Sequence, residues 1–238
     1  MRLIVTIIIS AFWVSVVGQQ TNYPQDYFRA PMDIPLYLAG NFGELRADHF
    51  HAGIDIKTQG VEGKKIYASA DGFVSRIKVQ HGGYGKVVYI DHPNGYTTAY
   101  AHLKEFSTKI DSFVKNEQYK NESFTINWYP SPYEIPVKKG EVIALSGNTG
   151  RSGGPHLHYE IRETKSEDPL NVLLFGMPIK DNIKPIIRGI RIYPLGDEST
   201  VNGQPKALYF NAINKDGKVA LDATPVVSKK IGLFKKIN

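Results

Sequence analysis

Two short segments far apart in the chain carry the donors of one metal site. His156-Leu157-His158 supplies two imidazoles, and His51-Ala52-Gly53-Ile54-Asp55 supplies an imidazole and a carboxylate. Zinc accepts imidazole nitrogen and carboxylate oxygen at about 2.0–2.2 Å, so His51, Asp55 and His158 form a plausible ligand set. Three protein ligands leave a fourth position open, which is the pattern of a catalytic zinc. The sequence has no cysteine with which to close a structural site.

The local geometry of both segments favours a shared ion. Alternate residues of a strand point to one face, so His156 and His158 project to the same side. One of them can bind the metal while the other faces the bound water.

A bend is required between His51 and Asp55. An extended chain would place them about 13 Å apart at roughly 3.3 Å per residue, which is too far to share an ion. Gly53 is the residue suited to that bend. Ile54 and Ile56 would anchor the following segment in the core.

A hydrolytic zinc site also needs groups that move protons and stabilise an oxyanion. No His-Glu-x-x-His helix is present, so imidazoles must take this role. His102, at the end of a strand-like run, and His156 are the available pair. The remaining histidines lie near turns and are given no role: His49, His81 and His92.

The segment between residues 65 and 162 has the pattern of an antiparallel sheet. Short alternating or apolar runs are punctuated by glycine, and Asp71-Gly72 and Pro93-Asn94-Gly95 are tight-turn signals. Tyr100 and Tyr159 are expected to pack in the core. The predicted strands are Lys65–Ser69, Gly72–Val79, Lys86–Asp91, Tyr96–His102, Glu141–Ser146 and His156–Arg162.

One interruption, over about residues 104–136, separates two of these strands. Ser107 could cap a short helix with Ile110, Phe113 and Val114 on one face, and an aromatic, proline-rich stretch follows at 128–133. As an insertion it could wall a substrate cleft. A surface loop packed on its own aromatics is an equal alternative.

The predicted organisation has four parts. Arg2 followed by an apolar run to Val17 and then Gly18 indicates a signal peptide over residues 1–18. The run is shorter than the about 20 residues of a spanning helix, although a retained amino-terminal anchor is the alternative. A lead-in over 19–40, a main domain over 41–175 and a β-rich appendage of unknown role over 176–238 follow. We expect export to the periplasm or cell envelope, or secretion, without stable membrane insertion.

Composition excludes several classes of protein. Hydrophobic residues are 42% and charged residues 22% of the 238, which excludes global disorder and a polytopic membrane protein. The absence of cysteine excludes disulfides and thiol catalysis. A net charge of +6 favours polyanions, and for an exported protein these are envelope polymers rather than nucleic acid. Lys229-Lys230 and Lys235-Lys236 are expected to form a solvated tail.

Several motifs occur in the order found in one peptidase family. From about residue 41 to 170, the chain resembles the LytM/lysostaphin-type zinc endopeptidases, family M23, which cleave peptide bridges in bacterial peptidoglycan. The matching motifs are Phe42-Gly43-x-x-Arg46, His51-x-Gly53-x-Asp55, Ala70-Asp71-Gly72, Gly83-Tyr84-Gly85, Ile90-Asp91-His92, Tyr100-Ala101-His102-Leu103, Val137-Lys138-Lys139-Gly140, Gly147-Asn148-Thr149-Gly150 and Gly154-Pro155-His156-Leu157-His158-Tyr159-Glu160.

The resemblance implies a mainly antiparallel β scaffold with one zinc ion in a groove. It implies that His51, Asp55 and His158 are the zinc ligands and that His102 and His156 are the catalytic histidines. It also implies peptidoglycan peptide stems as the partner. The long 104–136 segment and the 176–238 appendage depart from the family pattern and leave the substrate open.

Two other functions remain as alternatives. The first is a non-hydrolytic relative that binds or activates a cell-wall amidase, although such relatives lose zinc ligands and all five positions are intact here. The second is a lipoyl-type or sugar-phosphotransferase carrier, suggested by Val137-Lys138-Lys139-Gly140-Glu141-Val142. Those carriers work in the cytoplasm, so the export signal and Asp55 weigh against it.

Overall fold

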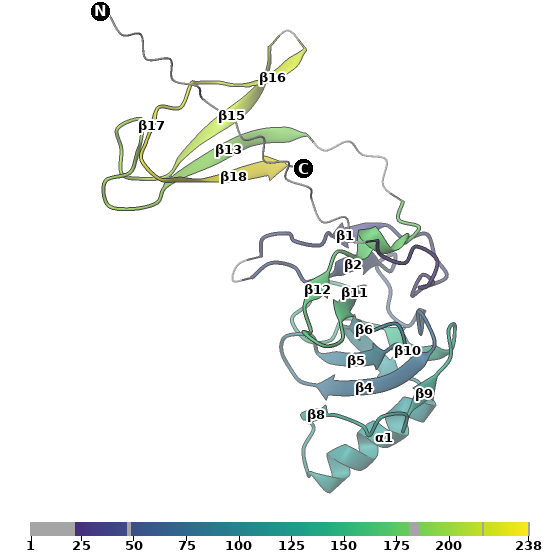
Figure 1. Cartoon of the computed structure of the whole chain (residues 1–238). Coiled ribbons are helices and arrows are strands. Elements are labelled where there is room, and N and C mark those ends of the chain that lie inside the picture. Colours follow the sequence, from purple (N-terminus) through teal and green to yellow (C-terminus); the bar gives the residue numbers. More distant parts are fainter. Residues whose placement is uncertain (1–21, 47–48, 181–185, 216, 238) are drawn as a thin grey trace, which may run out of the picture. The chain divides into compact units, whose positions relative to one another are not determined.

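The computed structural model describes residues 22–46, 49–180, 186–215 and 217–237 (Figure 1). The chain divides into two compact units at residues 181 and 182. Both units are built mainly of antiparallel β-strands, which confirms the predicted fold class. The predicted signal peptide lies outside the described residues. Within the described ranges, no helix has the length and apolar character needed to cross a membrane.

The first unit contains two sheets. Among its described residues, nine strands form the larger sheet, in the order β1-β2-β11-β6-β5-β4-β8, with β12 beside β11 and β9 beside β4. The smaller sheet has the order β3-β10-β7. The strands are β1 Leu38–Gly40, β2 Ile54–Lys57, β3 Lys65–Tyr67, β4 Gly72–Val79, β5 Lys86–Asp91, β6 Tyr96–Ala101, β7 Leu103–Phe106, β8 Ile126–Trp128, β9 Pro136–Val137, β10 Val142–Ser146, β11 His156–Glu163 and β12 Pro169–Leu170.

The turns follow from the sequence. Gly95, in Pro93-Asn94-Gly95, has φ +83° and closes the hairpin between β5 and β6, as predicted. Gly85 has φ +64°, and a Cβ there would lie 2.4 Å from the carbonyl carbon of Thr149. Only glycine tolerates both the left-handed backbone and this approach. Each predicted strand in this unit is present: Gly72–Val79 and Lys86–Asp91 have the predicted bounds, and the others differ by one or two residues at one end.

Alternation along β11 sets the core on one face of the sheet and polar side chains on the other. Leu157, Tyr159 and Ile161 are fully buried in the main hydrophobic cluster. The residues between them, at positions 156, 158, 160 and 162, share the opposite face because the side-chain period of a strand is two. Burial of such side chains is worth about 1.5–3 kcal/mol each, so the register of β11 is strongly fixed.

The same alternation holds on β2. Ile54 and Ile56 are fully buried and anchor this strand in the core, as predicted, while Asp55 lies on the polar face. Tyr100 and Tyr159 are fully buried and contact each other with ring centroids 5.3 Å apart. Their expected role in packing is therefore confirmed.

The segment from 104 to 136 is integrated into the fold. Helix α1, Thr108–Lys120, begins after Ser107, although the Ser107 side chain makes no capping hydrogen bond. Ile110 and Val114 are buried, and Phe113 stacks on Trp128 at 6.0 Å. β8 and β9 pair with β4, so the segment extends the sheet instead of forming a loop packed on itself (Figure 1).

The second unit is a small β structure, as predicted for the appendage. Its strands are β13 Ile187–Pro194, β14 Thr200–Val201, β15 Leu208–Lys215, β16 Lys218–Leu221, β17 Val227–Ser228 and β18 Ile231–Ile237. Ile192, Val201 and Phe210 form its core. Of the lysines expected in a solvated tail, Lys229 and Lys230 are exposed, whereas Lys235-Lys236 lies in β18, which pairs along β13, and is therefore not part of a tail.

Candidate metal centre

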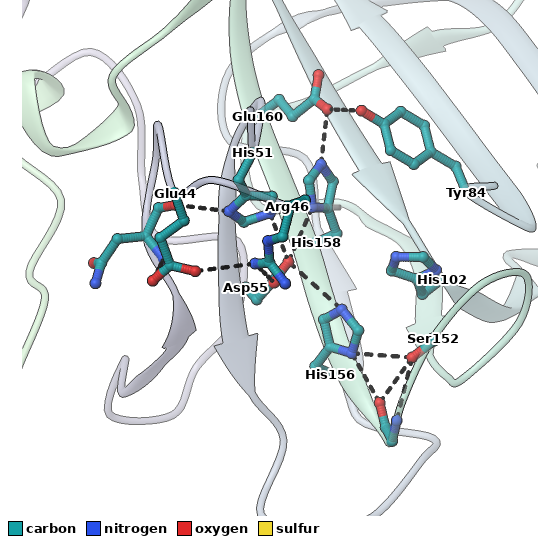
Figure 2. A network of polar contacts seen from close by, with 12 residues as sticks. Glu44, Arg46, His51, Asp55, Tyr84, His102, Ser152, His156, His158 and Glu160 are labelled. Atoms are coloured by element: carbon teal, nitrogen blue, oxygen red, sulfur yellow. Dashed lines mark hydrogen bonds and ion pairs between the residues drawn. The ribbon is translucent and has the colours of Figure 1, made fainter. Parts of the chain in front are cut away.

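Three buried side chains converge in the first unit. The ligand atoms of His51, Asp55 and His158 all lie within 4.8 Å of one another. His51 Nε2 is 3.0 Å and His158 Nδ1 is 2.9 Å from Asp55 Oδ1, and the two nitrogens are 3.0 Å apart (Figure 2). Two imidazoles and one carboxylate in this arrangement could hold a metal ion.

Strand pairing explains the convergence. His158 on β11 lies directly opposite Asp55 on β2 in the antiparallel register. The chain bends at Gly53, as predicted, and returns His51 to the same place. A Cβ on Gly53 would lie 2.3 Å from the carbonyl oxygen of Tyr159, so glycine is required here for close approach of two backbones.

Hydrogen bonds orient both imidazoles toward the pocket. His51 Nδ1 donates to the carbonyl of Asn41 at 2.7 Å, so Nε2 faces inward. His158 Nε2 donates to Glu160 Oε1 at 2.7 Å, so Nδ1 faces inward. Outer partners of this kind fix the tautomer of a metal-binding histidine. Three acceptor atoms therefore converge, which is a donor set that fits a cation.

Glu160 is the centre of a buried network that the sequence analysis missed. It is fully buried, accepts a hydrogen bond from Tyr84 and accepts one from Arg162 Nε at 2.5 Å. Burial opposes its charge, but the hydrogen bond from His158 and the charge of Arg162 outweigh burial and lower the pKa of Glu160 to about 2. The spacing of two between 158, 160 and 162 on a strand was the available signal.

Asp55 and His158 form a strongly polarised pair. Burial would raise the pKa of Asp55, but hydrogen bonds from the surrounding histidines hold it far below its usual range. Burial opposes the charge of His158, yet Asp55 and Glu160 outweigh it and raise the pKa of His158 to about 9. Without a metal, a proton on His158 therefore balances the carboxylates.

Arg46 is a second residue to which the sequence analysis gave no role. Its Nη2 lies 2.9 Å from Asp55 Oδ2 and 3.2 Å from Glu44. It therefore holds the carboxylate oxygen that does not face the imidazoles (Figure 2). Its place in the Phe42-Gly43-x-x-Arg46 motif was the only signal in the sequence.

His102 and His156 lie beside the three converging donors. Their ring centroids are 4.7 Å apart, and His102 is 5.9 Å from the His158 ring. His102 Nδ1 donates to the carbonyl of Thr149 at 2.8 Å, and His156 Nδ1 donates to that of Gly154 at 2.8 Å. His156 Nε2 is 3.5 Å from Asp55 Oδ1. Burial lowers the pKa of His102 to about 4.

All five residues predicted from the sequence line one open cavity of about 560 Å³. His49 also lines it, although no role was predicted for this histidine. No described residue from 104 to 136 lines this cavity. The idea that the insertion walls the substrate cleft therefore does not hold for it. The cavity is lined by Arg46, His49, His51, Ala52, Asp55, Gly83, Tyr84, His102, Arg151, Ser152, Gly153, His156 and His158.

The other two histidines lie elsewhere. His81 stacks on Phe124 at 4.8 Å. His92 is buried and hydrogen bonds to the carbonyl of Asp71 and to Thr98. His92 is thus a buried structural histidine and not the ordinary loop residue that was expected.

Comparison with known proteins identifies the domain that holds this cavity. Residues 49–119 and 133–171 match the model of peptidase family M23. The chain is 38% identical over 134 residues to the DD-carboxypeptidase/endopeptidase Mpg of Neisseria meningitidis, covering 56% of this chain and 24% of that protein. It is 34% identical over 154 residues to the murein hydrolase activator NlpD of Salmonella typhimurium, covering 64% of this chain and 33% of that protein.

The chain is also similar to a solved structure, that of the catalytic domain of the M23 protein EnpA from Enterococcus faecalis. The match covers 60% of this chain and 94% of that domain, with 22% identity and a TM-score of 0.44. This chain spans only about a quarter of the length of the curated relatives at 38–39% identity. The interruption of the family match at 120–132 falls within the predicted insertion. The domain that carries the candidate metal centre belongs to peptidase family M23.

Proposed function

We propose that this chain is an exported zinc metalloendopeptidase that hydrolyses peptide crosslinks or bridges of bacterial peptidoglycan. Its zinc ligands are His51, Asp55 and His158, and its catalytic histidines are His102 and His156. The observation that carries the proposal is the convergence of two oriented imidazoles and a buried carboxylate within 4.8 Å, beside two further imidazoles. The name of the Neisseria relative, a DD-carboxypeptidase/endopeptidase, supports the substrate class.

The donor set fits zinc on chemical grounds. Both inner imidazole nitrogens are acceptors when the rings are neutral, because each ring donates its other N–H outward. They cannot hydrogen bond to each other in that state, so a cation or a proton must lie between them. When bound, zinc supplies Lewis-acid polarisation of a scissile carbonyl and a lowered pKa for water.

His102 and His156 have complementary roles in this mechanism. Each donates Nδ1–H to a backbone carbonyl, so each neutral ring has Nε2 as an acceptor. Such a nitrogen can take a proton from the attacking water. Once protonated, the same Nε2 can donate to the developing oxyanion or to the leaving amine. The pKa of about 4 keeps His102 neutral at pH 7.

Clearing of purified peptidoglycan suspensions tests the proposal. The wild-type chain loaded with zinc should clear the suspension, and His158→Ala should not. His81→Ala is the matched control, because His81 lies outside the cavity. Equal clearing by wild type and His158→Ala would refute the metal mechanism.

The similarity to the murein hydrolase activator NlpD supports a second candidate, a non-hydrolytic adaptor for a cell-wall amidase. The complete donor set weighs against it. Clearing that occurs only when an amidase is added, and equally with His158→Ala, would favour the adaptor.

A further inference from the structure

A second cavity lies on the polar face of the main sheet, farther along β11 than the metal centre. Its volume is about 180 Å³, and a cavity of roughly 150 Å³ accommodates a benzene molecule, so a small chemical group fits. It is lined by Ser75, Arg76, Tyr89, Asp91, Thr97, Tyr129, Arg162, Glu163, Thr164 and Glu167.

Four neighbouring strands form the floor of this cavity. Arg162 on β11 is paired with Thr97 on β6, and Thr97 is paired with Asp91 on β5. Arg76 on β4 is paired with Tyr89 on β5. Because His158 and Arg162 are four residues apart on one strand, they share a face and lie about 13 Å apart along it.

The predicted insertion contributes a wall to this cavity through Tyr129. The Arg76 guanidinium lies 5.0 Å from the Tyr129 ring centre and 5.3 Å from that of Tyr89. The Arg162 guanidinium lies 5.7 Å from the Tyr89 ring. The two tyrosine rings therefore hold both guanidinium groups at this cavity.

Charges of both signs line the cavity. Arg76 and Arg162 contribute two guanidinium groups, and Asp91, Glu163 and Glu167 contribute three carboxylates. Ser75 and Thr97 both donate to Asp91 Oδ1 at 2.7 Å, which leaves Oδ2 as an acceptor for a ligand. Among the described residues, the group arranged to hold a metal is His51, Asp55 and His158, so these carboxylates do not form a cation site. A ligand with both charges fits best.

We propose that this cavity binds the zwitterionic head group of an amino acid. The carboxylate pairs with the guanidinium groups of Arg76 and Arg162, and the ammonium pairs with Asp91 and the acidic turn at 163–167. Charge-assisted bonds of this kind are the strong ones in proteins. The head group belongs to the peptide cleaved at the metal centre, a step that rests on the proposed function. The substrate then carries a free amino-acid head group about 13 Å, or roughly four extended residues, from the scissile bond.

Titration of the full chain with three small probes tests this site. Free D-alanine carries both charges, N-acetyl-D-alanine carries only the carboxylate, and D-alaninamide carries only the ammonium. The backbone amide NMR signals of Thr97 and Thr164 report binding at this cavity, because both residues line it and neither lines the cavity of the candidate metal centre. Free D-alanine should bind at least about tenfold more tightly than either analogue, because each lost charge removes a charge-assisted pair.

Two variants assign the binding to this cavity. Arg76→Gln and Tyr129→Ala should each weaken D-alanine binding about tenfold or more, measured in both variants by the Thr97 and Thr164 amide signals. Lys78→Gln is the matched control, because Lys78 lies on β4 outside the cavity. Tyr129 is 57% exposed, so its removal leaves the fold intact. Arg162 is left unchanged because it contacts Glu160, the partner of His158.

Smaller differences among the probes, no shift with any probe, or unchanged binding in Arg76→Gln would overturn the proposal. The titration requires no hydrolysis, so it separates this site from the proposed function. Binding without peptidoglycan clearing would leave the head-group site standing and refute the peptidase. Peptidoglycan clearing without D-alanine binding would refute the head-group site and leave the peptidase standing. If both hold, Arg76→Gln should raise the KM of a peptide with a free head group and leave unchanged the KM of the same peptide with the head-group carboxylate amidated, because Arg76 pairs with that carboxylate.

Discussion

Zinc affinity should depend on pH because a proton and the metal compete for His158. Asp55 Oδ1 and Glu160 Oε1 lie 2.9 and 2.7 Å from the two nitrogens of this buried ring and raise its pKa to about 9. Nδ1 must lose its proton before it can bind zinc. Below pH 9, each unit of pH therefore costs about a factor of ten in affinity, or roughly 1.4 kcal/mol.

Between pH 9 and pH 7 the expected loss is about a hundredfold, or roughly 2.7 kcal/mol. A competition titration against a chromophoric chelator of known pH dependence measures this slope. Calorimetry at pH 7 in buffers of different ionisation enthalpy should show about one proton released per zinc bound, since His158 is then almost fully protonated.

Glu160→Gln is the matched perturbation, because it keeps an acceptor for His158 and removes the charge that raises the pKa. In this variant the rise of zinc affinity with pH should stop at a lower pH, because the pKa of His158 is lower. The zinc affinity at pH 9 should fall about 10- to 100-fold. Glu105→Gln, on the exposed side of β7, should leave both unchanged. A wild-type affinity that is constant from pH 7 to 9, with no proton release, would refute this reasoning.

The remaining predictions concern stability and catalysis. Protonated His158 stabilises the metal-free fold, and this stabilisation is complete below pH 6.5 and lost as the pH rises through about 9. Thermal unfolding of the metal-free chain should therefore show about 3 kcal/mol less stability at high pH. Saturating zinc should remove this dependence. His102→Ala should lower kcat about 10²–10⁴-fold while zinc content by mass spectrometry stays at the wild-type level, and a parallel loss of zinc would contradict its catalytic role. Gly53→Ala should cost about 1–3 kcal/mol in denaturant unfolding, because its Cβ meets the Tyr159 carbonyl, and wild-type stability would exclude that contact.

Much of the fold could be predicted from the sequence because local signals agree with one another. The short apolar or alternating runs of β4, β5 and β11 indicate strands, and the Asn94-Gly95 turn specifies the observed pairing of β5 with β6. The spacing of His51 to Asp55 and of His156 to His158 predicted four side chains, and the end of a strand-like run predicted His102; the structure brings all five into one cavity. Motif order carried this prediction, since no single motif determines the contact between segments over 100 residues apart.

Other features depend on tertiary contacts that the sequence does not display. The bond of Glu160 to Tyr84 arises because two segments 76 residues apart in the sequence meet beside the candidate metal centre. β8 forms because it can pair with β4, which lies beside β5 and leaves its other side open to a partner, and Tyr129 is then carried to the second cavity. Lys235-Lys236 is locally typical of a tail, yet pairing with β13 makes it part of a strand, since strand formation depends strongly on context.

The position of the bound metal decides whether His51, Asp55 and His158 are the zinc ligands. Anomalous diffraction at the zinc edge, from crystals of the chain grown with zinc, locates the ion independently of any activity. The account predicts one peak about 2.0–2.2 Å from His51 Nε2, an Asp55 carboxylate oxygen and His158 Nδ1. A peak elsewhere in the cavity, or none at these three side chains, would contradict it.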